Sequence, residues 1–172
     1  KVKVTYTFTD HNELGIHYQA STDQTTLCSL TNHAYFNLDG TKSDVRQHTL
    51  RLRAGFMVPT DGNGIPLGPL ALVDGTSFNF NQPKRLDADF LADEQQQGAK
   101  GYDHSYLLDR TPSNGNQAAA ELISADGQLS LQRPFKQPFG ELLEQPVFAN
   151  QLLGLEVVVV SEQTIQQFFV NG

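Results

Sequence analysis

The chain has 172 residues, of which 38% are hydrophobic, and it carries a net charge of −7 at neutral pH. This length suits one domain or most of a larger one. The acidic balance argues against nucleic acid or an anionic membrane as partner, because both bind clustered lysine and arginine.

Cysteine usage and hydropathy narrow the class of protein further. Cys28 is the single cysteine, so an internal disulfide is excluded, and no cysteine–histidine set has zinc spacing. No apolar run is long enough to cross a membrane, and the first residues alternate at once, unlike a signal peptide. We therefore expect a cytoplasmic protein without metal or cofactor.

The first twenty residues predict a β-hairpin. Apolar and polar residues alternate over residues 2–8 and again over residues 14–20, which places the apolar side chains on one sheet face. The polar residues 10–13 between the two runs are typical of a turn. Residues 25–31 form a third β-rich segment.

Later strands are predicted by the same alternation, and helix is scarce. Leu50 and Leu52 should point inward from the first of these strands, and Phe78 and Phe80 from the second. A helical turn fits residues 83–97, with Leu86 on its apolar face. A further hairpin is expected around the Ala-Asp-Gly turn at residues 125–127. The predicted strands are 48–54, 76–80, 105–108, 118–124, 128–132, 155–160 and 164–170.

This order of elements favours an all-β fold, an antiparallel β-sandwich. Residues 1–172 are expected to form a single domain. Residues 133–150 interrupt the pattern with three prolines and no clean period, and we interpret them as an irregular insertion.

One candidate site is the segment of residues 31–38, where His33 stands among Asn32, Tyr35 and a second asparagine. A polar pocket that transfers protons near neutral pH would have this composition, because the unperturbed pKa of histidine is near 6.5. Spacing alone favours the alternative, a histidine that bonds backbone carbonyls and supports a turn.

A second candidate is the segment of residues 101–106, where Asp103 stands beside two tyrosines and His104. Carboxylates accept hydrogen bonds from neighbouring sugar hydroxyls, and aromatic rings pack on their C–H faces. The structural alternative is an aspartate that caps a turn.

The remaining polar residues carry weaker signals. His11 and His17 are expected to be solvated and His48 to be structural. The acidic residues between 87 and 94 lack the ordered ligand loop of a calcium site and read as a solvated helix face.

Several motifs in fixed order resemble the aldose 1-epimerase family. The most specific is LTNHAYFNLDG at residues 30–40, which resembles the signature of bacterial members. The similarity runs over residues 4–132 and resumes at residues 155–169. The further motifs are SDVRQH (43–48), GIP (64–66), GTSF (75–78), FLAD (90–93) and GYDH (101–104).

The resemblance implies a galactose mutarotase-like supersandwich that interconverts the α and β anomers of a free hexose, galactose or glucose, without cofactor or metal. It implies that His33 is the general acid at the ring oxygen and that Asp103 holds sugar hydroxyls. Gln167 resembles the sugar-binding glutamine of the family, although a one-residue slip would give this role to Gln166. Asn32 and Tyr35 would shape the pocket.

The resemblance also places the family's general-base glutamate beyond residue 172 and further sugar-binding residues before Lys1. We therefore expect both ends of the family fold to be absent and the chain alone to have weak activity. Exposed sheet edges should permit self-association. A noncatalytic carbohydrate-binding β-sandwich is the alternative function, and a sugar-phosphate epimerase ranks lower because no basic cluster surrounds His33 or Asp103.

Overall fold

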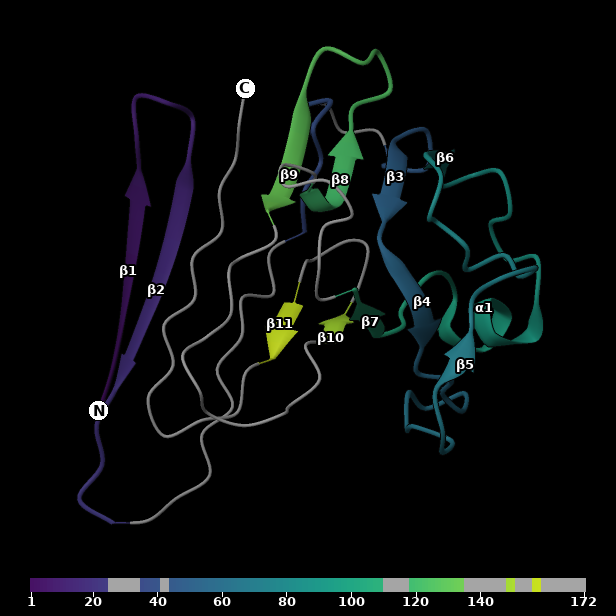
Figure 1. The fold of residues 1–172 in the computed structure, drawn as a ribbon, viewed down its shortest axis with the longest axis horizontal. Helices are drawn as coiled ribbons and strands as arrows, with labels where there is room; N and C mark the ends of the chain where they lie inside the picture. The colour runs from purple at the N-terminus through teal and green to yellow at the C-terminus, as the bar shows by residue number, and fades with distance from the viewer. Residues whose placement is uncertain (25–34, 41–43, 110–117, 135–147, 151–155, 159–172) are drawn as a thin grey trace.

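The computed structural model describes residues 1–24, 35–40, 44–109, 118–134, 148–150 and 156–158. Within these ranges the chain forms β-strands and one short helix, and every strand pair is antiparallel (Figure 1). The predicted all-β fold is confirmed. The elements are β1 (Val2–Phe8), β2 (Leu14–Ala20), β3 (Thr49–Leu52), β4 (Ala54–Met57), β5 (Ala71–Leu72), β6 (Lys84–Arg85), α1 (Glu94–Ala99), β7 (Tyr106–Leu108), β8 (Ala118–Ile123), β9 (Ser130–Pro134), β10 (Phe148–Asn150) and β11 (Glu156–Val158).

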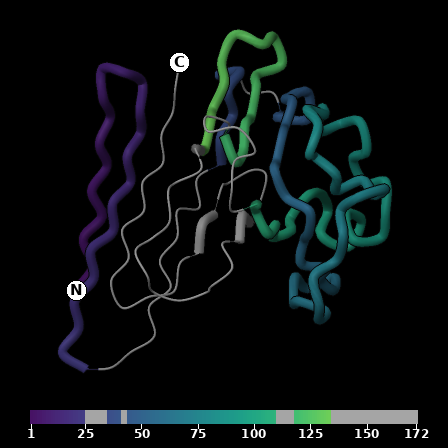
Figure 2. Tube along the Cα trace, viewed as in Figure 1, coloured from purple at the N-terminus to yellow at the C-terminus, as the bar shows by residue number. Residues whose placement is uncertain are grey.

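β1 and β2 form the predicted N-terminal hairpin, which lies on the opposite side of the molecule from α1 (Figures 1 and 2). Tyr6 stands opposite Ile16 and Val4 opposite Tyr18, so the apolar residues of both strands share one face. Ile16 and Tyr18 are buried, whereas the apolar side chains of β1 are 41–69% exposed. Self-association through exposed sheet edges stays a prediction.

The core lies among two further sheets, which are joined at a corner of the chain. β3 belongs to the sheet with strand order β6-β3-β8-β9, and β4 belongs to the sheet with order β11-β10-β7-β4-β5. Arg53 alone separates β3 from β4, and its backbone N–H donates to Ala119 while its carbonyl accepts from Asp109. As predicted, Leu50 and Leu52 are buried, and they belong to the same core cluster as Tyr106 and residues of β8.

The prediction of a strand over residues 76–80 is wrong. Phe78 and Phe80 are buried as expected, but the segment is a series of turns. Local hydrogen bonds explain the difference, because the Thr76 N–H and hydroxyl both donate to the Val73 carbonyl and the Asn79 N–H donates to the Thr76 carbonyl. Beyond these turns, the side-chain amide of Asn81 donates to the Ala54 carbonyl at 3.0 Å and accepts from the Ala54 N–H at 3.3 Å.

The helix also differs from its prediction over residues 83–97. Residues 84 and 85 form β6, and the helix begins only after Asp93, whose extended backbone and side chain cap it. Leu86 is buried as predicted, but the helical segment is Glu94–Ala99. An effective N-cap at Asp93 therefore sets the helix start.

The later strands are found where the structure describes them. β7 and the β8–β9 hairpin agree with prediction, and β11 falls within the expected strand at 155–160. Of the predicted insertion at 133–150, the first two residues continue β9 and the last three form β10; residues 135–147, like the predicted strands at 25–31 and 164–170, lie outside the described residues. No helix in the described part of the chain is long and apolar enough to cross a membrane.

Candidate functional site

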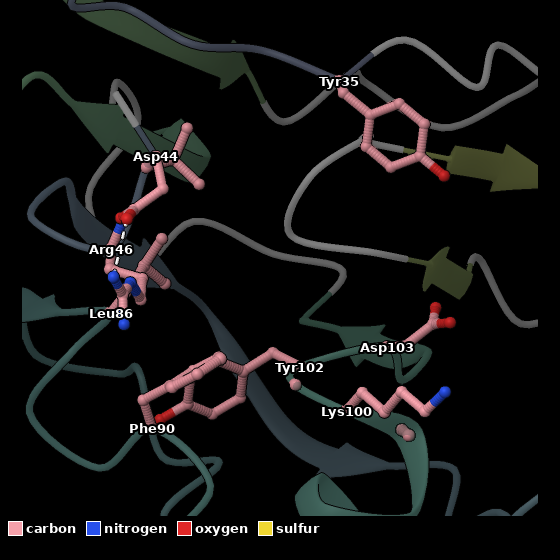
Figure 3. A pocket seen from close by; sticks show the side chains of 11 residues that line it. Tyr35, Asp44, Arg46, Leu86, Phe90, Lys100, Tyr102 and Asp103 are labelled. Carbon is pink, nitrogen blue, oxygen red and sulfur yellow. Dashed lines mark hydrogen bonds and ion pairs between the residues drawn. The ribbon is translucent and has the colours of Figure 1, made fainter. Parts of the chain in front are cut away.

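Two of the predicted site residues, Tyr35 and Asp103, line one pocket of about 620 Å³ (Figure 3). Residues from separate parts of the chain line this pocket: residue 35, residues 44–46, residues 86 and 90, and residues 99–103. Its volume lies within the range of about 300–1,000 Å³ that is usual for small-molecule sites. His33, Asn32 and Gln167 lie outside the described residues.

Buried His48 holds the loop that follows His33. Its side chain is fully buried, and its Nε2 accepts a hydrogen bond of 3.0 Å from the N–H of Leu38. Because Nε2 is the acceptor, the ring proton belongs on Nδ1, which lies 3.8 Å from the Asp39 carboxylate. This geometry supports the structural role predicted for His48.

The same loop is tied to the β8–β9 turn. Asp39 Oδ1 accepts from the Ala125 N–H at 3.0 Å, and Asn37 Oδ1 accepts from the Asp39 N–H at 3.1 Å. The signature segment therefore ends in a loop fixed to both β3 and β8, which places Tyr35, 62% exposed, at the pocket.

Helix α1 is anchored at its start by a buried polar network. The Asp93 side chain accepts from the Gln96 N–H at 3.0 Å and from the Ser77 hydroxyl. The Gln96 side chain is buried, donates to Ser77 Oγ at 2.8 Å and accepts from the Leu91 N–H at 2.6 Å. Since each group has a partner, the network fixes the helix against the core.

The end of α1 forms the turn that delivers Asp103 to the pocket. The Gly101 N–H donates to the Gln96 carbonyl at 2.8 Å and the Lys100 N–H to the Gln97 carbonyl at 3.4 Å, as in a Schellman motif. Gly101 has a φ of 149°, and a Cβ there would meet the Phe90 ring at 3.3 Å. A larger residue at 101 would therefore disturb the turn.

Lys100 occupies the left-handed position of this motif, where glycine is usual. Its φ is 61° and its ψ is 27°. For a residue with a Cβ this conformation costs roughly 1–2 kcal/mol. A positive charge at an exposed helix C-terminus returns only about 0.3–1 kcal/mol. Helix capping alone therefore gives no net advantage to lysine here.

The pocket floor is aromatic and apolar. Tyr102 is 8% exposed and meets Phe80 edge-on, with ring centroids 5.1 Å apart. Burial raises the pKa of Tyr102 to about 12, so its phenol stays protonated. Phe90 and Leu86 line the same pocket, and such surfaces suit the C–H face of a sugar ring.

Side chains alternate in direction along the predicted segment 101–106. His104 and Tyr106 are 2% exposed and point into the core, whereas Asp103 is exposed at the pocket. His104 packs on Phe78 at 4.7 Å between ring centroids, and burial lowers its pKa while the Asp103 charge opposes this shift. Asp103 is therefore the residue of this segment that is placed to meet a ligand.

An ion pair forms another part of the pocket wall. Asp44 and Arg46 are joined at 2.7 Å, and hydrogen bonding by Arg46 lowers the pKa of Asp44 to about 2. The Arg46 guanidinium also lies 5.9 Å from the centre of the Phe90 ring. Sequence reasoning placed Arg46 in a family motif but gave it no role, and it missed Phe90 and Lys100 as pocket residues.

The weaker candidates have structural explanations. His11 is exposed as expected, but His17 is half-buried, so its predicted solvation is wrong in part. Asp87 pairs with Arg85 and Asp89 with Lys84. Among the described residues, no group of three or more side chains could hold a metal ion.

The chain is an all-β protein with an exposed carboxylate beside a largely apolar pocket, and the comparisons with known proteins identify its family. The family model described as aldose 1-epimerase matches residues 1–138. The chain therefore belongs to the aldose 1-epimerase family.

Individual relatives agree with this assignment. An aldose 1-epimerase of Escherichia coli K12 is 45% identical over 128 residues, which cover 74% of this chain and 37% of that protein. A galactose mutarotase of Sus scrofa is 39% identical over 112 residues, covering 64% of this chain and 31% of the relative.

The solved structures include a galactose 1-epimerase from Lactobacillus acidophilus NCFM, which superposes with a TM-score of 0.61 at 33% identity. That match covers 72% of this chain and 35% of the other. The chain thus matches about a third of the length of these relatives.

Proposed function

We propose that this chain carries the acid and the hydroxyl-binding part of an aldose 1-epimerase site, which interconverts the α and β anomers of a free hexose such as galactose. One observation supports this above all: Tyr35 and Asp103, 68 positions apart in the sequence, line one pocket with an apolar floor. Both lie within the 138 residues that the family model matches.

In the proposed reaction, His33 protonates the ring oxygen while a base removes the proton of the C1 hydroxyl. The ring opens, the aldehyde group rotates, and the ring closes on either face. A positioned acid and base each contribute typically about 10²–10⁴-fold. The reaction balances without cofactor or metal, because the protons that leave on opening return on closing.

The other predicted residues bind and orient the sugar. The exposed Asp103 carboxylate accepts hydrogen bonds from hydroxyls, with Gln167 as a further partner, while Asn32 and Tyr35 shape the pocket. The apolar ring face of the hexose would lie on the floor formed by Phe90 and Tyr102. The names of the relatives are those of enzymes, which favours catalysis over a purely carbohydrate-binding role.

Galactose binding and mutarotation by the purified chain test the proposal. We expect galactose binding that depends on Asp103 and mutarotation that depends on His33. Titration of wild type and Asp103→Asn with galactose measures the first, and the optical rotation of fresh α-galactose with wild type and His33→Ala measures the second. Equal binding by wild type and Asp103→Asn would rule out the proposed sugar site.

A further inference from the structure

We infer that Lys100 is a substrate-binding residue of the proposed sugar pocket, where its ammonium group donates hydrogen bonds to the hydroxyls that Asp103 holds. The inference rests on the proposed function and extends it to a residue outside the motifs quoted for the family. Two independent observations carry it, the place of the side chain and the conformation of its backbone.

The side chain lies at the pocket. Lys100 and Asp103 both line it, at either end of the turn that leaves α1. Figure 3 shows the Lys100 amine and the Asp103 carboxylate extending in the same direction, with the hydroxyl of Tyr35 on that side as well. The lining of the pocket therefore includes a cation, a carboxylate and a phenol.

A glycine at position 100 would relieve the strain of the left-handed backbone conformation there. Three described residues other than glycine have positive φ: Asn12, Leu91 and Lys100. Asparagine tolerates this conformation. Leu91 shares the strain without lining the pocket, so strain alone is not a sign of function. Lys100 combines the strain with a position at the site, which is where such strain is usually retained.

The Lys100 ammonium group and the Asp103 carboxylate together can satisfy both the donors and the acceptors of neighbouring sugar hydroxyls. An ionised carboxylate only accepts hydrogen bonds, so a hydroxyl bound to Asp103 must donate its proton to it. The oxygen of that hydroxyl still has lone pairs, and an ammonium group with three donors can satisfy them. A hydroxyl that donates to a carboxylate is also polarised into a better acceptor. Neighbouring hydroxyls of a neutral hexose fit between Lys100 and Asp103.

The side chain is not otherwise engaged at the helix end. Within the part of the chain that the structure describes, the hydrogen bonds of Lys100 are those of its backbone at the C-cap, and no ion pair holds its ammonium group. The ammonium group is therefore available to a ligand at the pocket.

Substitution of Lys100 by glycine separates a role in binding from a role in folding. A binding residue held in a strained conformation should give a variant that is more stable but binds galactose more weakly. Lys100→Gly should raise the melting temperature by about 2–4 °C, since it relieves the left-handed strain. The same variant should weaken galactose binding by roughly ten-fold or more, because a charged hydrogen bond is lost. Lys100→Met keeps the strain and removes the charge, so it should weaken binding with little change in melting temperature.

Leu91→Gly is the matched control. It relieves the same backbone strain at a residue that is 40% exposed and does not line the pocket. It should leave the galactose affinity unchanged, and its melting temperature shows the relief of strain offset by the loss of a partly buried leucine side chain. Calorimetric titration with galactose and thermal unfolding without sugar provide both readouts for each variant.

The outcomes distinguish this inference from the proposed function. If Asp103→Asn loses binding while Lys100→Gly and Lys100→Met bind galactose as tightly as wild type, the role of Lys100 is refuted and the sugar site stands. A parallel loss of stability and affinity in Lys100→Gly would make Lys100 structural and overturn the inference. If wild-type binding does not depend on Asp103, both proposals fall.

Discussion

The strongest structural test concerns His48, which anchors the loop after His33 to the core. Its Nε2 accepts the Leu38 N–H at 3.0 Å from a fully buried ring. Replacement by phenylalanine keeps an aromatic ring of similar size and removes the acceptor. Leu38 would then hold an N–H without its partner at the half-buried base of the signature loop.

The size of the stability change in His48→Phe follows from the loss of the two ring nitrogens. An unsatisfied buried donor costs about 1–3 kcal/mol, and the partial exposure of Leu38 places it in the lower half of that range. A small gain opposes this loss, because Nδ1 is buried, makes no hydrogen bond to a described residue, and disappears in the variant. We expect His48→Phe to lower the free energy of unfolding by about 1–2 kcal/mol.

Urea unfolding followed by far-ultraviolet circular dichroism measures this change, since the chain lacks tryptophan. With a slope of about 2 kcal/mol/M, the midpoint should fall by roughly 0.5–1 M. His48→Gln is the control, because its side-chain oxygen can still accept from Leu38 and should recover at least half of the loss. A His48→Phe protein as stable as wild type would refute the anchoring role.

Two further predictions concern the segment that carries Asp103. Burial lowers the pKa of His104, so at mildly acidic pH the unfolded chain binds a proton that the folded chain does not. The stability that His104 contributes is therefore present above its unfolded pKa near 6.5 and is lost as the pH falls below that value. Thermal unfolding between pH 7.5 and about 5 should therefore show a flatter pH dependence for His104→Gln than for wild type, and identical profiles would contradict this. Asp93→Ala should lower the free energy of unfolding by about 1–2 kcal/mol through loss of the helix cap. Asp93→Asn keeps an acceptor oxygen and should lose less by the same measurement, whereas equal losses would exclude the capping hydrogen bond as the cause.

Local signals in the sequence predicted the hairpins well. β1 and β2 alternate with period two on either side of a polar turn, and β8 and β9 flank Gly127, whose φ is 73°. Each of these patterns is contained within about twenty neighbouring residues, so no distant part of the chain has to be known.

The two wrong predictions of secondary structure have local hydrogen-bonding causes. The spacing of Phe78 and Phe80 indicates a strand, and both rings are buried as a strand would bury them. The backbone nevertheless turns, because Thr76 donates back to the Val73 carbonyl and Asn79 to the Thr76 carbonyl. An alternation of apolar residues therefore predicts burial more reliably than it predicts strand geometry.

The site was predictable only in part, because its residues come from distant parts of the chain. Asp103 and Tyr35 belong to motifs that can be read from the sequence, but Lys100 becomes notable only through its left-handed backbone and its place at the pocket. Phe90 likewise joins the floor only because the chain folds back after β6. Phe90 belongs to the FLAD motif, but nothing in that motif places it at the pocket, and Lys100 lies outside the quoted motifs.

The position of Asp103 shows how this fold serves recognition. The residues on both sides of it, Tyr102 and His104, are held in the core, and the turn before them is fixed to Gln96 in a buried network. An exposed carboxylate on so constrained a backbone loses little freedom when a sugar binds, and this lowers the entropic cost of recognition. Disturbing Gln96 should therefore affect the pocket without any contact to the ligand.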